Sequence, residues 1–414
     1  MPFAALGLTP ALTRAAGMQG FVVPTAIQQA AIPAILRGQD VLGRAQTGSG
    51  KTAAFALPLL QRLIAGRSET PRRLRALILA PTRELAVQIG DVILALAQGF
   101  AQPLKTVVAF GGISINPQMM DLRGGADIVV ATPGRLLDLI DRNALKIGDV
   151  QTLVLDEADR LLDLGFADEI NRIIALLPAF RQSLLFSATF PQSVEALADK
   201  MLMNPTRIDV EPQTTTAATI VQRSIEVDRH RRGELLTRLI HDNGWTRALV
   251  FVATQREAEQ LAYQLCHVGI RAAPFHGELS QRKRTTALAD LNSHALQVVI
   301  ATDVAARGLD IPQLPVVVNY DLPRSADDYT HRIGRTGRAG ESGLAISFVS
   351  ADTEAHFRLI EKRNNLRLPR ERIAGFEPRQ QPAVTPPGAP GGGVKGKRKS
   401  KKDKLREAAA RGES

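Results

Sequence analysis

A glycine-rich segment and a short acidic run further along the chain constrain this sequence most. The first, Ala45–Thr52, lies between the run Val41–Gly43 and an apolar stretch that begins at Ala53, a pattern that predicts a strand, a loop and a helix. Such loops direct backbone N–H groups and a helix N-terminus at bound phosphates, with a lysine on the outer phosphates and a hydroxyl on Mg²⁺. We therefore predict a phosphate site; an ordinary Gly/Ser turn before a helix is the alternative. Its residues would be Gln46, Thr47, Gly48, Ser49, Gly50, Lys51 and Thr52.

The acidic run Asp156–Asp159 directly follows Thr152–Leu155, which is predicted to be a buried parallel strand. Carboxylates at the carboxyl end of such a strand face the crevice where α/β sheets bind ligands. We expect Asp156 to serve the metal and Glu157 to orient and deprotonate the attacking water. A four-residue acidic run alone is usually a solvated turn, but the two motifs together, each behind a strand, favour a nucleotide site.

Composition limits the classes of protein that this chain can belong to. At 414 residues it exceeds one ordinary core, and 44% hydrophobic with 22% charged residues is typical of soluble globular domains. Cys266 is the only cysteine, which excludes an intrachain disulfide and a multi-cysteine zinc site. No apolar run approaches the ~18 residues of a membrane span, and the N-terminus does not resemble a secretion signal. These features predict a cytoplasmic protein.

The net charge of +11 suggests a polyanionic partner, although aromatic residues at 4% do not favour broad stacking platforms for nucleic acid. The charge is uneven, because the last twenty residues, 395–414, carry nine Lys or Arg against three Asp or Glu. Before them, Pro382–Gly393 holds four prolines and four glycines. We predict a disordered basic C-terminal tail over 377–414.

Short Val/Ile/Leu runs alternate with helical stretches, which predicts an α/β fold with mostly parallel sheets. Val210–Ala217 has no helical period and divides the chain into two α/β units of similar size. The expected boundaries are 1–30, 31–208, a linker at 209–218, 219–376 and the tail. The predicted strands are 76–79, 106–110, 128–130, 153–155 and 184–186 in the first unit, and 248–252, 298–300, 316–318 and 345–348 in the second.

From Phe3 to about Phe376 the chain resembles the DEAD-box RNA helicases of superfamily 2, which implies two RecA-like domains. Gly20-Phe21, Pro24-Thr25 and Gln28 resemble the adenine-reading Q motif, and Ala45 at the start of the phosphate loop is usual in that family. The remaining motifs follow in the family's order: Pro81–Ala86, Gly111-Gly112, Thr132–Arg135, Asp156–Asp159, Ser187–Thr189, Val250–Thr254, Gln281–Arg284, Ala301–Asp310 and His331–Arg338.

The resemblance implies a role for each motif in the binding and hydrolysis of ATP. Gln28 would pair with the adenine edge, and Phe21 would stack on the base unless it is a core residue. Asp310 would accept hydrogen bonds from the ribose hydroxyls.

The remaining residues would act on the γ-phosphate. Arg335 and Arg338 would reach the γ-phosphate from the second domain. His331 would link the γ-phosphate to Ser187 and Thr189.

The resemblance also implies RNA contacts, made through backbone amides and basic side chains without reading bases. For each of these residues, a structural role in a turn is an open alternative, most of all for Asp303. In the first domain they are Arg83, Gly111, Gly112, Thr132, Gly134 and Arg135; in the second they are Arg284, Thr302 and Asp303.

We therefore predict an ATP- and Mg²⁺-dependent RNA helicase that unwinds short duplexes or remodels ribonucleoproteins. Ribosomal precursors and the RNA-degradation machinery are compatible partners. Asn116–Met120 and Ile373–Pro378 resemble the bacterial subgroup called RhlE. An RNA-binding clamp or assembly chaperone, with ATP setting its residence time, is the alternative that the sequence leaves open. A DNA translocase is disfavoured by Asp159 and Gln28.

Overall fold

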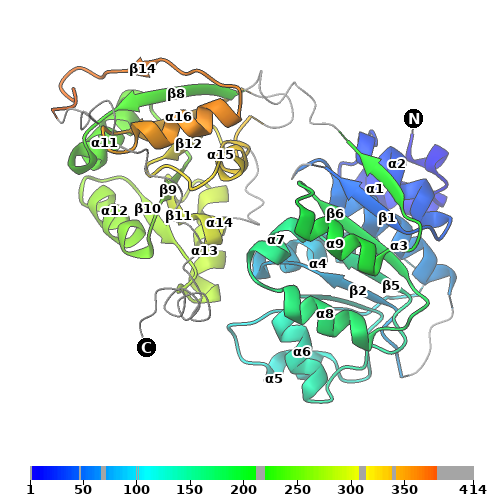
Figure 1. Ribbon diagram of the computed structural model, residues 1–414. Coiled ribbons are helices and arrows are strands. Elements are labelled where there is room, and N and C mark those ends of the chain that lie inside the picture. The colour runs from blue at the N-terminus through cyan, green and yellow to red at the C-terminus, as the bar shows by residue number, and fades with distance from the viewer. Residues whose placement is uncertain are drawn as a thin grey trace, which may run out of the picture.

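The computed structural model describes residues 2–45, 48–66, 71–98, 100, 102–210, 220–306, 314–337 and 342–379. Within these ranges the chain forms two α/β domains (Figure 1), each built on a sheet of seven parallel strands. The predicted fold class is therefore confirmed. No helix among the described residues is long and apolar enough to cross a membrane.

The first sheet has the strand order β3-β4-β2-β5-β6-β1-β7. Its strands are β1 Val41–Arg44, β2 Ala76–Leu79, β3 Thr106–Ala109, β4 Ile128–Ala131, β5 Thr152–Leu155, β6 Gln182–Ser187 and β7 Thr206–Asp209. The central strands are buried on both faces, as expected when helices cover both sides of a parallel sheet.

Alternate residues of each strand enter two separate cores. Ile78 and Val130 pack with one set of helices, whereas Leu77 and Val129 pack with the other. The first set is α1 Pro10–Met18, α2 Ala26–Leu36, α3 Lys51–Ala65 and α4 Arg83–Ala97, with the 3-10 turn η1 Phe3–Leu6. The second set is α5 Asn116–Asp121, α6 Pro133–Asp141, α7 Ala158–Asp163, α8 Ala167–Leu176 and α9 Gln192–Met201.

The second sheet has the order β10-β11-β9-β12-β13-β8-β14. Its strands are β8 Ile220–Glu226, β9 Ala248–Val252, β10 Ala272–Phe275, β11 Val298–Thr302, β12 Val316–Asn319, β13 Gly343–Val349 and β14 Arg370–Glu371. Its helices are η2 Arg229–Arg231, α11 Arg232–Asp242, α12 Gln255–His267, α13 Gln281–Asn292, α14 Asp303–Ala306, α15 Ala326–Ile333 and α16 Glu354–Arg363. The two sheets share one strand order when the strands are matched by position.

All predicted strands are present, but four observed strands, β7, β8, β10 and β14, have no counterpart in the prediction. Two of them, β7 and β14, are sheet edges, and β10 is the edge on the opposite side of the second sheet. An edge strand has fewer buried side chains, so its sequence lacks the continuous apolar run that marks a central strand. β8 is not an edge strand, since it pairs with β13 and β14, but the run Gln222-Arg223-Ser224 interrupts its apolar residues.

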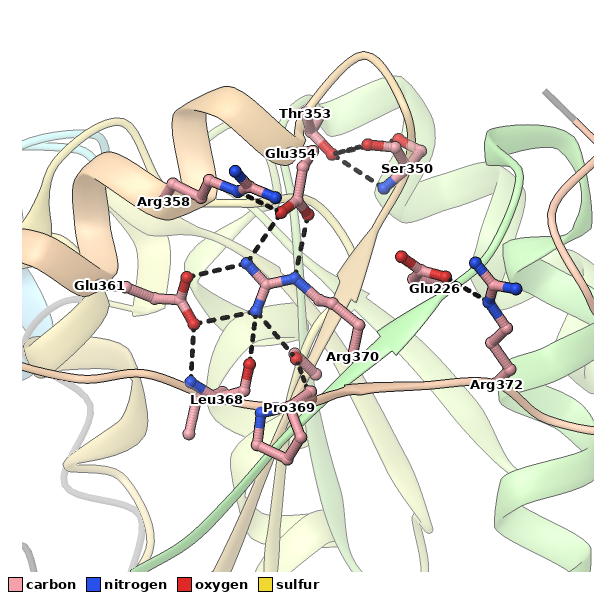
Figure 2. Close-up of polar contacts among 11 residues, drawn as sticks. Glu226, Ser350, Thr353, Glu354, Arg358, Glu361, Leu368, Pro369, Arg370 and Arg372 are labelled. Carbon is pink, nitrogen blue, oxygen red and sulfur yellow. Dashed lines mark hydrogen bonds and ion pairs between the residues drawn. The ribbon is translucent and has the colours of Figure 1, made fainter. Parts of the chain in front are cut away.

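The chain after α16 is fastened to the second domain by charge pairs. Arg370 lies between Glu354 and Glu361 of α16, with distances of 2.9 Å and 2.8 Å to the two carboxylates (Figure 2). Arg372 pairs with Glu226 on the neighbouring strand at 2.7 Å. Packing continues to Arg379, whose backbone N–H donates to Asp228 at 2.9 Å. Residues 211–218 of the predicted linker at 209–218 lie outside the described residues, as does the predicted tail at 377–414 from residue 380 onward. Asp209 is instead the last residue of β7.

Candidate active site

The loop before α3 has the geometry of a phosphate cradle. Gly50, at the N-cap of α3, has φ +89°, a conformation that favours glycine, and a Cβ there would collide with the amide of Gln28. Lys51 is buried, and its Nζ donates to the carbonyl of Ala45 at 2.9 Å. The Ser49 Oγ is buried with no hydrogen-bond partner among the described residues. Gly48 is also left-handed. Gln46 and Thr47 lie outside the described residues.

These features fit a nucleotide phosphate. The loop offers an unsatisfied hydroxyl, a buried ammonium group and the N-terminus of a 15-residue helix at one point. Buried polar groups in native proteins are normally paired, so the Ser49 hydroxyl, which has no partner in the described part of the chain, indicates a ligand position.

Gln28 connects the N-terminal segment to this loop. Its side-chain oxygen accepts from the Thr25 N–H at 2.9 Å, and its nitrogen donates to the Gly50 carbonyl at 3.1 Å. Thr25 and Gln28 also form a capping box at the start of α2. The predicted adenine-reading amide therefore lies against the phosphate loop. Phe21 is half-buried and packs on the core that contains α1 to α4. This packing agrees with the alternative that Phe21 is a core residue.

The two predicted acidic residues follow β5, and their pKa values shift in opposite directions. Burial raises the pKa of Asp156 to about 6, although Lys51 acts in the opposite direction. Burial also acts to raise the pKa of Glu157, but Arg160, Lys51 and Arg335 outweigh it, and the pKa of Glu157 lies below its usual value. The Arg160 guanidinium is 2.7 Å from the Glu157 carboxylate. Glu157 is thus held as the charged form that a general base requires.

Magnesium would find oxygen donors here but no complete protein cage. Thr52 and Asp156 supply the hydroxyl and carboxylate oxygens that this ion prefers. Among the described residues, no group of three or more His, Cys, Asp or Glu side chains could hold a metal by itself. This arrangement suits Mg²⁺, which usually keeps several waters and binds through substrate phosphates.

Asp159 joins the acidic run to the segment after β6. Its carboxylate accepts from both the N–H and the hydroxyl of Thr189, each at 2.9 Å. The Ser187 hydroxyl accepts from the Asp159 N–H at 3.2 Å and donates to the Thr189 carbonyl at 2.7 Å. Ser187 and Thr189 therefore fix the position of Asp159, the last residue of the acidic run, through their hydrogen bonds.

Two residues of the second domain, His331 and Arg335, interact electrostatically with charged residues of the first domain. Burial lowers the pKa of His331, with Asp159 acting against it and Arg335 and Arg160 acting with it. Arg335 is itself buried and acts on Glu157. His331 and Arg335 thus interact electrostatically with the carboxylates of the first domain, whereas their contacts with the γ-phosphate stay predictions. Arg338 and Asp310 lie outside the described residues.

A second contact between the domains involves a residue predicted to bind RNA. Arg284 on α13 pairs with Glu84 at the start of α4 at 2.9 Å, and both side chains are buried. Gln281 donates to the same carboxylate at 3.4 Å. The Arg284 guanidinium also lies over the Phe275 ring, 4.9 Å from its centroid. Arg284 is therefore placed to hold the two domains together, and this role is favoured over direct contact with an RNA phosphate.

The other predicted RNA residues of the first domain cluster at the carboxyl ends of β2, β3 and β4. Gly112 has φ +80°, and a Cβ there would overlap the guanidinium of Arg83. Arg135 is buried and donates to the Ile113 carbonyl at 2.7 Å, so it supports the glycine loop from below. Gly111 and Gly134 have open space beside them. Thr132 is buried at the N-cap of α6.

Strand order separates these residues from the phosphate loop. Neighbours β3, β4 and β2 carry the predicted RNA residues, whereas β5, β6 and β1 carry the acidic run, Ser187 and the phosphate loop. One sheet edge therefore presents two adjacent regions of different chemistry.

The second domain has a cavity of about 470 Å³ at the matching edge, over β9, β10 and β11. Thr302, a predicted RNA residue, is part of its wall. Asp303 instead pairs with Arg332 at 2.6 Å, which is the structural role left open for it. The residues around the cavity are Ala253, Thr254, Gln255, Arg256, Gly277 and Thr302.

The chain holds two RecA-like domains, with a phosphate loop in the first and an arginine of the second, Arg335, that acts on the carboxylate of Glu157. This combination defines a nucleotide-dependent enzyme of the helicase class. Family models agree: the DEAD/DEAH box helicase model matches residues 25–197, and the helicase conserved C-terminal domain matches residues 231–340. The chain belongs to the DEAD-box helicases, and the enzyme class is that of ATP-dependent RNA helicases.

Relatives and solved structures extend over most of the chain. The ATP-dependent RNA helicase CshA of Listeria monocytogenes is 39% identical over 366 residues, 88% of this chain and 69% of that protein. The ATP-dependent rRNA helicase rrp3 of Emericella nidulans is 42% identical over 90% of this chain and 79% of its own length. Dbp5 of S. cerevisiae bound to RNA and ADP BeF3 superposes with a TM-score of 0.79 at 33% identity, covering 89% of this chain and 95% of that chain.

Sequence reasoning assigned no role to Arg160 or Glu84, although both lie inside or beside quoted motifs. Arg160 could have been found, because it stands three residues after Glu157, a spacing at which side chains meet if a helix follows the acidic run, as α7 does. Glu84 could not, since its partner Arg284 is 200 positions away and in the other domain.

Proposed function

We propose that this protein locally unwinds short RNA duplexes, or remodels ribonucleoproteins, by coupling ATP hydrolysis to closure of its two domains. The observation that carries the proposal is the buried pair of Arg284 and Glu84, which joins the two domains at 2.9 Å. Charges also act between the domains, since Asp159 affects the pKa of His331 and Arg335 affects that of Glu157. Hydrolysis then depends on the approach of the domains, and RNA bound across both domains would favour that approach.

Within the closed cleft, each residue has a chemical task. Lys51 would neutralise the outer phosphates, and Gln28 would orient the adenine. Glu157 would accept the proton of the attacking water while Arg335 and Arg338 stabilise charge that develops on the γ-phosphate. Mg²⁺ held at Thr52 and Asp156 would supply further charge neutralisation on the phosphates.

RNA would bind along the edges of both sheets through backbone amides and basic side chains. In the first domain, open space at Gly111 and Gly134 allows close approach of a phosphate. In the second, the cavity beside Thr302 lies at the matching edge. These contacts would not depend on the RNA sequence, because backbone amides and basic side chains that bind phosphates do not read bases.

Steady-state ATP hydrolysis with and without a generic single-stranded RNA tests the proposal. We expect strong stimulation by RNA, none by single-stranded DNA, and no turnover in Lys51→Ala. Equal rates with and without RNA would contradict the coupling. A strand-separation assay on a short RNA duplex then distinguishes unwinding from the clamp alternative, which predicts long-lived ATP-dependent RNA binding without release of a strand.

Several finer assignments stay predictions. These are the RhlE-like subgroup, the cytoplasmic location, the domain boundaries, and partners among ribosomal precursors or the RNA-degradation machinery.

A further inference from the structure

The loop that forms one side of the second-domain cavity is held from beneath by a side chain outside the quoted motifs. Asp321, just after β12, accepts a hydrogen bond from the Ala253 N–H at 2.9 Å. Ala253 and Thr254 are exposed at the cavity, and the Thr254 hydroxyl accepts from the Glu257 N–H at 3.1 Å to cap α12. The direction in which this loop leaves β9 is therefore set by one acceptor, the Asp321 carboxylate.

Asp321 is itself fixed by a buried arginine. Arg232, at the start of α11, is 2% exposed and lies 2.8 Å from the other oxygen of Asp321. Its second nitrogen donates to the Ser350 hydroxyl at 2.8 Å, and that hydroxyl donates to Asp352 at 2.6 Å. The carboxylate thus has one oxygen directed at the loop and one at a rigid support.

A charge pair this deep is a poor way to gain stability. Removing two charges from water is costly, and replacement of such pairs by apolar residues of similar volume is often neutral or stabilising. Burial accordingly raises the pKa of Asp321 and lowers that of Arg232. The pair is better explained by the position that it imposes on the Ala253 N–H than by its contribution to folding.

We propose that Asp321 is a positioning residue for RNA binding, which holds the Ala253–Arg256 loop in the orientation that the RNA backbone requires. This inference rests on the proposed function, since it needs RNA at the second-domain cavity. Arg232 orients Asp321 and therefore acts on the Ala253–Arg256 loop only through that carboxylate. Neither side chain touches the RNA.

Two double variants of the 414-residue chain isolate the single hydrogen bond. Arg232→Leu with Asp321→Leu removes the charge pair and the acceptor. Arg232→Leu with Asp321→Asn removes the charge pair but keeps an oxygen of nearly the same position for the Ala253 N–H. Because Leu and Asn have similar shapes, the two proteins differ mainly in that acceptor.

The measurements are the oligouridylate concentration that half-maximally stimulates ATP hydrolysis, the rate at saturating oligouridylate, and the Tm. We expect the half-maximal concentration to be about fivefold to tenfold higher in the Leu/Leu variant than in the Leu/Asn variant, as for loss of one hydrogen bond. The saturated rates should agree within about twofold, because a positioning role in binding acts on KM and not on kcat. Equal half-maximal concentrations in the two folded variants would overturn the inference.

Two controls make the result specific. Glu371→Gln breaks the Arg223–Glu371 pair elsewhere in the same sheet and should change the Tm without changing the half-maximal RNA concentration. If the Leu/Leu variant does not fold, Arg232→Leu with Asp321→Ala takes its place, since alanine also lacks the acceptor. If RNA fails to stimulate the wild-type protein, the proposed function fails; if it does stimulate and the variants agree, the inference alone fails.

Discussion

Glu157 combines a strained backbone with a restrained carboxylate. Its φ of 51° and ψ of 55° lie in the left-handed region, which is unfavourable for a residue with a side chain, at a cost on the order of 1 kcal/mol or more. The strain is maintained by its neighbours: Glu157 donates its N–H to Asp156, and its carboxylate pairs with Arg160. Such local strain is typical of residues whose exact position serves chemistry.

We predict that Glu157→Gln binds ATP and RNA with wild-type affinity but hydrolyses ATP about a hundredfold more slowly, because an amide cannot accept the proton of water. Steady-state hydrolysis and equilibrium binding of a fluorescent ATP analogue measure the two effects. Asp168→Asn, at an exposed carboxylate on α8 of the same domain, is the control and should leave both unchanged. Undiminished turnover in Glu157→Gln would exclude the role as general base.

At the scale of elements, the segment after α16 depends on Arg370. Figure 2 shows its guanidinium between two carboxylates of α16, and it also lies over the ring of Phe357, 4.8 Å from the centroid. Its N–H groups reach the Ser224 hydroxyl and the Leu368 carbonyl as well. One side chain therefore joins α16, β8 and β14.

We predict that Arg370→Met destabilises the second domain by about 2 kcal/mol, because Glu354 and Glu361 are then left partly buried without a cation. The matched control is Arg372→Met, whose arginine is 66% exposed, and it should change stability by less than about 1 kcal/mol. Urea unfolding followed by circular dichroism measures both. Similar losses in the two variants would show that Arg370 is not the main support of this segment.

The same cluster predicts a pH dependence. Burial alone would raise the pKa of Glu354 and of Glu361, but the hydrogen bonds from Arg370 outweigh it and both lie below the usual 4.5. Their contribution to stability is therefore fully present above pH 4.5 and is lost as the pH falls through the lowered values. The stability difference between wild type and Arg370→Met should accordingly shrink in acid.

At the scale of the whole molecule, the buried pair of Glu84 and Arg284 is a direct link between the domains. We predict that Glu84→Arg and Arg284→Glu each lower RNA-stimulated hydrolysis by about tenfold, because each places like charges in the closed interface. The double reversal should recover much of the loss, as coupled residues do in a mutant cycle. If the two losses of RNA-stimulated hydrolysis simply add in the double variant, Glu84 and Arg284 do not pair directly in the active form.

The basic tail provides a second prediction at this scale. Deletion of residues 395–414 removes a net charge of +6 and should weaken RNA binding at low salt, with a smaller effect as salt rises. The slope of affinity against salt concentration, measured by fluorescence anisotropy, should become shallower. A control with the same twenty residues in shuffled order should bind as wild type, since phosphate contacts are insensitive to order. Unchanged low-salt affinity after the deletion would refute the role.

Local sequence patterns are sufficient to predict the central strands, the α/β class and the positions of the phosphate loop and the acidic run. These features are local: Val/Ile/Leu runs buried on both faces mark central strands, and Lys51, Asp156 and Glu157 each follow such a run. Parallel topology then brings their carboxyl ends to one edge without further information. The family resemblance added the second-domain arginines.

Tertiary structure alone decided the edge strands and the partners of the charged residues. β7 and β14 have no continuous apolar run, because only one side of an edge strand is paired and its sequence is under weaker constraint. The pairing of Arg284 with Glu84, and of Asp321 with the Ala253 N–H, joins residues distant in sequence. Charge pairs of this kind leave no periodic pattern, since an arginine directed at a carboxylate and one directed at RNA are identical in sequence.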